Sequence, residues 1–186
     1  ERAALGRARY TANSQYFVSL GFAVFVPTRI GYGATGGPDL EDTGPCNSKN
    51  YPPGYDAAAQ LTTQVINHAR RLPYVEPGRG LVVGQSFGGA TAITMATRPT
   101  EGLVATINFA GGGGGNPATR PAQPCRSDLL RAMFTDYGRS ARIPTLWLYS
   151  ENDRYWGASL PRTWFDGFTA AGGRGRFVQL PANGDD

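Results

Sequence analysis

Short apolar runs alternate along this chain with segments in which apolar residues recur at helical spacing. The apolar runs end in Gly, Pro, Ser or Asn and lie at residues 22–28, 80–86, 103–111, 144–150 and 176–181. The segments of helical period lie at about 8–20, 56–72, 87–98, 127–138 and 159–171. Near-continuous apolar runs of this length are typical of strands buried on both faces of a parallel sheet. The alternation therefore predicts a single α/β domain over residues 1–186, with a doubly wound, mostly parallel sheet flanked by helices on both faces.

Two long segments rich in Gly and Pro, residues 29–55 and 111–125, leave the carboxyl ends of predicted strands, where open α/β sheets bind ligands. Residues 31–36, GYGATG, match the dinucleotide pattern G-x-G-x-x-G, but the prolines that follow prevent the helix that would bind a pyrophosphate. The five glycines at 111–115 lack the Gly-Lys-Ser/Thr of a phosphate loop and predict a flexible turn that can also line a pocket. We therefore expect no nucleotide and no other cofactor.

Composition and charge argue against several classes of protein. A length of 186 residues suits one domain with a sizeable core. The net charge of +4 comes from 18 basic and 14 acidic residues, and the arginines are scattered, which argues against a nucleic-acid partner. No apolar run approaches the roughly 18 residues that cross a membrane. The first 27 residues lack the features of a signal peptide, so we expect either a mature protein that begins here or a fragment.

The two cysteines, Cys46 and Cys125, lie in the two Pro-rich loops. They are either free thiols or a disulfide. The disulfide is favoured, because exposed loop cysteines in a chain with a single lysine and many Gly and Pro residues fit an oxidising compartment. We expect no metal site, because two cysteines far from the only histidine do not form a ligand set. The location that follows is secreted or periplasmic, with the cytoplasm as the alternative.

The most specific signal is the stretch VVGQSFGGA at residues 82–90. A predicted strand leads into G-x-S-x-G, and a helix follows that has no proline until Pro99. Such a turn strains the backbone of the serine and lifts its hydroxyl above the sheet, and small residues at both glycines avoid a clash between strand and helix. Ser86 would then be a nucleophile, and the Phe87 N–H an oxyanion donor. The alternative is a chance match in a chain with 26 glycines.

The longer stretch GLVVGQSFGGATAITMA resembles the nucleophile elbow of the α/β-hydrolase superfamily, and IPTLWLYSENDRYWG resembles the strand end that carries its catalytic acid. FVPTRIGYGATGG and INFAGG are similar to dienelactone-hydrolase-like members. The resemblance starts at about residue 10 and implies an α/β-hydrolase fold that is incomplete at its N- and C-termini. It implies that Ser86 is the nucleophile and Asp153 the acid of a catalytic triad. Glu151 and Asp166 are alternative candidates for the acid, although Glu151 could instead form a hydrogen bond to loop backbone. Asp153 itself could have a purely structural role as the cap of its turn.

The family also implies a histidine base that follows the acid in the chain, whereas the only histidine, His68, precedes the nucleophile. His68 lies in mid-helix among apolar residues at i, i+4, i+7 spacing, so we expect it to point at the sheet or its rim as a structural residue. The resemblance implies a base just beyond Asp186 and a second oxyanion donor before Glu1. We therefore expect a fragment of a longer hydrolase, with a complete but catalytically inactive relative as the alternative.

The expected activity is hydrolysis of a small-molecule carboxylic ester or lactone through an acyl-enzyme at Ser86, with little or no turnover in the absence of the histidine. A peptidase or thioesterase on the same fold and a non-catalytic binding module are the alternatives. Tyr32, Tyr155 and Trp156 flank the predicted site from two loops and are either pocket walls or ordinary aromatic residues. The sequence does not define an oligomeric state.

Overall fold

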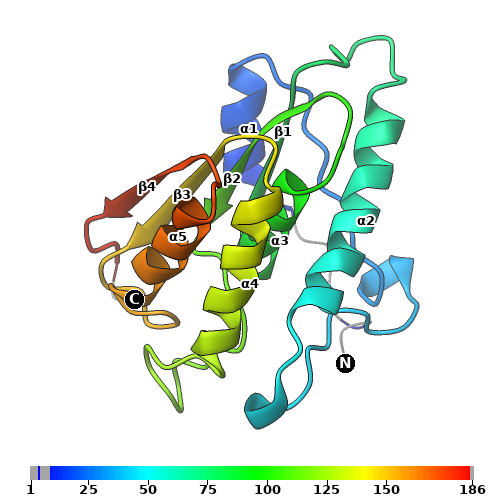
Figure 1. Ribbon diagram of the computed structural model, residues 1–186. Coiled ribbons are helices and arrows are strands. Elements are labelled where there is room, and N and C mark those ends of the chain that lie inside the picture. The colour runs from blue at the N-terminus through cyan, green and yellow to red at the C-terminus, as the bar shows by residue number, and fades with distance from the viewer. Residues whose placement is uncertain (1–3, 5–8, 185–186) are drawn as a thin grey trace.

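The computed structural model describes residue 4 and residues 9–184 (Figure 1). At its centre lies a parallel sheet with the strand order β1-β2-β3-β4. The strands are β1 (Gly80–Gln85), β2 (Leu103–Phe109), β3 (Thr145–Ser150) and β4 (Gly175–Leu180). The predicted α/β class and parallel sheet are confirmed. Because the order is consecutive, the reversal that characterises a doubly wound sheet does not occur among the described strands.

Most of the helices cover one face of the sheet, while the first helix of the chain lies behind the sheet in Figure 1. The helices are α1 (Thr11–Ser19), α2 (Pro52–Ala69), α3 (Phe87–Ala96), α4 (Ser127–Ser140) and α5 (Leu160–Ala170), with the short 3-10 helices η2 (Gly33–Thr35) and η3 (Cys46–Ser48). Helices α3, α4 and α5 are the crossovers between neighbouring parallel strands, and right-handed crossovers in one direction place them on one face. Figure 1 shows α2 to α5 side by side in front of the sheet, in agreement with their packing contacts.

Helix α2 begins four residues before its predicted start at residue 56. Its first two residues are Pro52 and Pro53, in the first turn of the helix. Proline is well tolerated there, because its fixed φ suits a helix and its missing N–H would have no acceptor. The prolines that suggested a loop in the sequence therefore start the helix.

The prediction of a first strand at residues 22–28 is wrong. The segment pairs with no strand of the described sheet, and Val24 and Phe25 are each 37 % exposed. An apolar, β-branched run forms a strand only where its backbone finds a partner, because strand propensity reflects packing and pairing more than local preference. Strands β1 to β4 have such partners, and this segment has none among the described strands.

The core lies between the sheet and α3 to α5 and is unusually aromatic. Trp147, at the centre of β3, is fully buried and contacts Phe134 of α4 and Phe165 and Phe168 of α5. The opposite face of the sheet is less covered, since Val104 is 45 % exposed. The strands are therefore less buried on this face than the prediction of burial on both faces implied.

Candidate active site

Ser86 occupies a sharp turn between the sheet and a helix. Strand β1 ends at Gln85 and α3 begins at Phe87, so one residue makes the connection. Ser86 has φ 54° and ψ −120°, a combination that side-chain-bearing residues rarely adopt and that costs on the order of 1–3 kcal/mol. Its side chain is exposed. The strand, turn and helix predicted around the serine are all present.

Gly84 allows this turn to close. A Cβ at position 84 would overlap the carbonyl oxygen of Gly88 in the first turn of α3. The Cβ position of Gly88 faces open space, whereas a Cβ on Gly89 would overlap the side-chain oxygen of Asn108. The prediction that only a very small residue fits is therefore confirmed at position 84 and wrong at position 88. Position 89 also requires a very small residue, which the sequence reasoning missed.

Hydrogen bonds hold the strained backbone of Ser86 on both sides. Its N–H donates to the carbonyl of Phe109 at 3.0 Å, at the end of β2. Its carbonyl accepts from the N–H of Gly112 at 3.3 Å and from the first turn of α3, at Gly89 and Ala90. The turn at residues 109–112 therefore fixes the peptide groups that flank the serine side chain.

Phe87 places a backbone donor beside Ser86. As the first residue of α3 its N–H has no acceptor within the helix, and the helix dipole adds positive potential at this end. The ring is anchored by Tyr55, with centroids 4.5 Å apart, and by the guanidinium of Arg29 at 5.2 Å. Such a donor can stabilise negative charge on an oxygen bound next to Ser86.

Asp153 lies in the loop after β3, and one of its oxygens is already engaged. Oδ1 accepts the N–H groups of Tyr155 at 2.8 Å and Trp156 at 3.0 Å. Burial raises the pKa of the carboxyl group, and the two backbone hydrogen bonds oppose that shift. Asp153 therefore does cap its turn, as the alternative had it, through Oδ1, and Oδ2 takes no part in the cap.

The two rival carboxylates have other partners. Glu151 Oε1 accepts the N–H of Ala182 at 3.1 Å, so this side chain binds loop backbone, as its position suggested. Asn152 acts alongside it, accepting the N–H of Asn183 at 3.1 Å. Asp166 lies on α5 in an exposed ion pair with Arg162. The chain after β4 is thus held beside the loop that carries Asp153.

Ser86 and Asp153 lie at the same edge of the sheet. They follow β1 and β3, which are separated only by β2. With a strand spacing of about 4.8 Å, the ends of these two strands lie roughly 10 Å apart. A gap of this size between the strand ends is too wide for a direct hydrogen bond across them.

His68 lies far from this edge. Tyr55, near the start of α2, packs on Phe87, whereas Arg70, just past the other end, bonds to the carbonyl of Pro77 before β1. His68 follows Tyr55 by 13 residues of helix, or roughly 20 Å at about 1.5 Å per residue. Its side chain is exposed, so of the two expected positions, the sheet or its rim, the buried one against the sheet is wrong, while its exclusion as the base agrees with the geometry.

The three aromatic residues predicted near the site differ in their surroundings. Tyr32 is partly buried and donates its hydroxyl hydrogen bond to Glu41 at 3.1 Å. Tyr155 is 47 % exposed. Trp156 is buried, and its indole N–H donates to the carbonyl of Ala110 at 2.8 Å, so it holds the residue that precedes the glycines at 111–115. Their role as pocket walls stays a prediction.

The glycines at 111–115, which we call the glycine loop, are packed rather than open. A Cβ on Gly113 would overlap the hydroxyl of Tyr55. The Tyr51 hydroxyl donates to the carbonyls of Gly113, at 3.2 Å, and Cys125, and burial raises its pKa to about 12, so it stays protonated. The expectation of a flexible turn does not fit these contacts. The sequence reasoning missed both tyrosines, because nothing around Tyr51 and Tyr55 in the sequence indicates a partner about 60 residues away.

The disulfide between Cys46 and Cys125 is confirmed, with Cα atoms 5.0 Å apart. It joins η3, in the loop before α2, to the segment that follows the glycine loop. Arg120 donates to both sulfurs, and the N–H of Cys125 donates to the carbonyl of Gly114 at 3.0 Å. The bridge therefore ties the two long loops together at the edge of the sheet where Ser86 lies.

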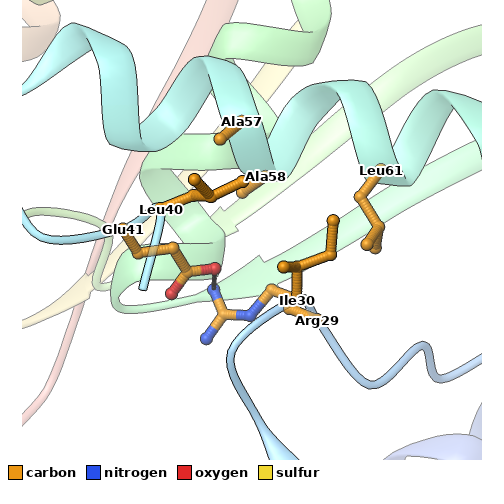
Figure 2. Close-up of a pocket in the computed structure, with 7 residues that line it drawn as sticks. All are labelled: Arg29, Ile30, Leu40, Glu41, Ala57, Ala58 and Leu61. Atoms are coloured by element: carbon orange, nitrogen blue, oxygen red, sulfur yellow. Dashed lines mark ion pairs between the residues drawn. The ribbon is translucent and has the colours of Figure 1, made fainter. Parts of the chain in front are cut away.

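A small hollow lies between the loop before α2 and α2 itself (Figure 2). Arg29 and Glu41 point toward one another there and form an ion pair at 3.2 Å. Arg29 connects the hollow to the active site through its contact with the Phe87 ring, but neither Ser86 nor Asp153 lines it.

Two further searches cover the part of the chain that the structure describes. It holds no group of three or more His, Cys, Asp or Glu side chains placed to bind a metal ion. None of its helices combines the length and the apolar character needed to cross a membrane.

Solved structures with a similar fold share little sequence identity with this chain. A protein classed as a dienelactone hydrolase from Klebsiella pneumoniae has 20 % identity and a TM-score of 0.52, over 70 % of this chain and 50 % of its own. An acetyl xylan esterase from Paenibacillus sp. R4 has 13 % identity and a TM-score of 0.64, over 96 % of this chain and 66 % of its own. The acylaminoacyl peptidase of Pyrococcus horikoshii has 12 % identity and a TM-score of 0.51, over 70 % and 23 %.

These structures share the fold of the chain, which spans about half the length of the first of them. No curated protein matches it in sequence. The model of the Alpha/beta hydrolase family, by contrast, matches residues 4–184, nearly the entire chain. With the nucleophile elbow and the parallel sheet in place, this match shows that the chain belongs to the α/β-hydrolase family.

Proposed function

We propose that this protein is a serine hydrolase that cleaves carboxylic esters, lactones included, through an acyl-enzyme at Ser86. The observation that carries the proposal is the strained, exposed serine at the start of α3. A residue keeps such φ and ψ only where its surroundings enforce them, and strain of this kind is concentrated at functional sites. The elbow presents the hydroxyl next to the Phe87 N–H, which is the geometry that acyl transfer requires.

In the proposed reaction the Ser86 oxygen attacks the ester carbonyl while its proton passes to a general base. The carbonyl oxygen becomes an oxyanion that the Phe87 N–H helps to stabilise. The C–O bond to the alcohol breaks, the base returns the proton to the departing oxygen, and an acyl-serine remains. Water then attacks the acyl-serine with the help of the same base, which releases the acid and restores Ser86.

We assign the base to a histidine after β4, as the family resemblance implies, and its orientation to Asp153. Two contacts support this assignment. Glu151 and Asn152 hold the backbone of residues 182–183 beside the Asp153 loop, so the chain that leaves β4 passes close to the acid. The hydrogen bonds that Asp153 makes in its own turn use Oδ1, so Oδ2 is the oxygen we assign to the imidazole.

Esters are the proposed substrates because an alcohol is a better leaving group than an amine and demands less of a general acid. Ester hydrolysis is named for the Paenibacillus protein and peptide hydrolysis for the Pyrococcus protein. A substrate panel must therefore include amides and thioesters. We also propose a secreted or periplasmic location, supported by the disulfide.

The test is covalent labelling of the full-length protein with a fluorophosphonate, followed by peptide mapping. We expect one adduct, on Ser86, and none in Ser86→Ala. Kinetics on matched p-nitrophenyl esters, thioesters and anilides then rank the substrate classes, with esters expected first. A folded protein whose Ser86 does not react would show that the elbow is only a structural turn and would overturn the proposal.

A further inference from the structure

Two polar side chains are buried in the sheet beneath the elbow. Asn108 of β2 is fully buried, and Tyr149 of β3 is 1 % exposed. The Asn108 amide donates to the Tyr149 hydroxyl at 3.0 Å, and the hydroxyl donates to the carbonyl of Gly111 at 2.7 Å. Burial raises the pKa of Tyr149 well above its usual value, so the hydroxyl stays protonated and keeps donating. The three groups form a directed chain from amide to hydroxyl to carbonyl.

This chain ends on the turn that holds Ser86. Gly111 precedes Gly112, whose N–H donates to the carbonyl of Ser86 at 3.3 Å. Phe109, at the other end of the turn, accepts the N–H of Ser86 at 3.0 Å. Any movement of Gly111 would therefore reach both backbone hydrogen bonds that hold the serine in its strained conformation.

The two side chains are poorly suited to a purely structural role. The Tyr149 ring stacks on Phe177 at 5.7 Å and tilts against Trp147, and a phenylalanine would fill the same space. The side-chain oxygen of Asn108 is buried and has no hydrogen-bond partner among the described residues, which costs stability. That oxygen lies against Gly89 and Gly111, between the first turn of α3 and the turn below Ser86.

We propose that Tyr149 and Asn108 are positioning residues, which hold the turn at 109–112 and through it the reactive backbone conformation of Ser86. The proposal rests on the proposed function, since the reactivity of Ser86 is the property that they control. Neither side chain touches the substrate. Tyr149 acts directly on Gly111, and Asn108 acts by orienting the Tyr149 hydroxyl.

The main test is Tyr149→Phe in the full-length protein, which removes one oxygen and keeps the ring. Because small displacements of a reacting group are costly, we expect kcat and the rate of fluorophosphonate labelling to fall by about tenfold or more, with KM unchanged. Tyr137→Phe is the matched control, because its hydroxyl is also buried but belongs to α4 and makes no hydrogen bond to the turn at 109–112 among the described residues. We expect wild-type kinetics from that variant.

A second variant tests whether Asn108 acts through Tyr149. Asn108→Val removes the donor to Tyr149 but leaves the bond between Tyr149 and Gly111. We expect a smaller fall in the labelling rate than in Tyr149→Phe, and no further fall when the two changes are combined, because one chain of bonds is broken in both.

Hydrogen exchange separates this proposal from the proposed function. In Tyr149→Phe we expect faster exchange of the amides of Ser86 and Gly112, with α4 and α5 unchanged. If wild-type Ser86 is unreactive, the proposed function fails, and the exchange pattern still tests the role of Tyr149. The positioning role is overturned if Tyr149→Phe exchanges and reacts like the wild type, or if its losses spread evenly over the whole fold.

Discussion

The elbow and the glycine loop leave the same edge of the sheet and meet at Ser86, but they are held in different ways. The elbow is closed mainly by its immediate neighbours, with Gly84 packed on the Gly88 carbonyl and the Ser86 carbonyl bound by α3, and the turn at 109–112 adds two hydrogen bonds. The glycine loop is held from a distance. Tyr149 lies 38 residues from Gly111, Tyr51 lies 62 residues from Gly113, and the disulfide spans 79 residues.

This difference predicts where each loop is vulnerable. A single Cβ added at Gly84 in the elbow would clash with backbone atoms, and no side-chain movement can remove that clash. A single change in the glycine loop removes one of several attachments, each worth a fraction of the stability of the protein. The predictions below run from the largest expected change in the free energy of unfolding to the smallest.

The largest effect is expected from Gly84→Ala. The added Cβ would overlap the Gly88 carbonyl oxygen, and because backbone must move we expect a loss of at least about 3 kcal/mol, together with loss of Ser86 labelling. Gly88→Ala is the matched control, since its Cβ position is open, and alanine in a helix should leave stability equal or up to about 1 kcal/mol higher. Chemical denaturation measures both. Equal losses in the two variants would refute the local account of the elbow.

The next effect is expected from loss of the disulfide. In Cys46→Ser/Cys125→Ser we expect a loss of about 2–4 kcal/mol, because the unfolded chain is no longer closed across this span. Denaturant midpoints of this variant and of the reduced wild type should agree. Thiol titration of the denatured, unreduced wild type should find no free thiol, and a result of two would show that the bridge does not form.

A smaller effect is expected from Tyr51→Phe. The change leaves the carbonyls of Gly113 and Cys125 without this donor, and we expect a loss of about 1–2 kcal/mol, as for a buried acceptor that loses its partner. Tyr74, which is 71 % exposed, supplies the control, and Tyr74→Phe should change stability by less than about 0.5 kcal/mol. Denaturation curves for the pair give the difference. A Tyr51→Phe protein as stable as its control would mean that the Tyr51 hydroxyl does not stabilise the glycine loop.

The same contrast explains what the sequence could predict. Ser86, Phe87 and Gly84 lie within a few residues of each other, so the motif and its flanking strand and helix were enough to predict the elbow. The disulfide could be favoured because both cysteines lie in Pro-rich loops of a chain whose composition fits an oxidising compartment. Tyr51, Asn108 and Tyr149 act on residues far along the chain, and their positions beside a proline pair or inside apolar strands carry no local sign of the partner.

The unpaired segment at residues 22–28 is the reverse case. Its composition is that of a strand, and local sequence predicted one. Whether such a run pairs depends on a neighbouring backbone that lies elsewhere in the chain, and the described sheet provides none. The local pattern reports a preference for extended backbone and not the presence of a partner strand. It therefore identified the four strands that have partners and failed at the segment that has none.

The smallest change in stability is expected from Asp153→Asn, which tests whether the local role of this residue as a turn cap is its only role. Asparagine keeps the Oδ1 acceptor for Tyr155 and Trp156. Burial raises the folded-state pKa of Asp153 above its unfolded value. The stabilisation linked to this group is thus present at low pH and is lost as the pH rises through the folded pKa. At neutral pH the ionised carboxylate slightly destabilises the folded state, so Asp153→Asn should be as stable as the wild type or slightly more stable.

Activity should respond in the opposite way. A carboxylate is needed to stabilise the cation of the base, so we expect Asp153→Asn to lose about 10³- to 10⁴-fold in kcat. Asp153→Ala removes the cap as well and should lose about 1 kcal/mol of stability. If Asp153→Asn stays active while Asp153→Ala is destabilised, Asp153 is a turn cap alone, and the acid of the triad must be sought elsewhere at this edge.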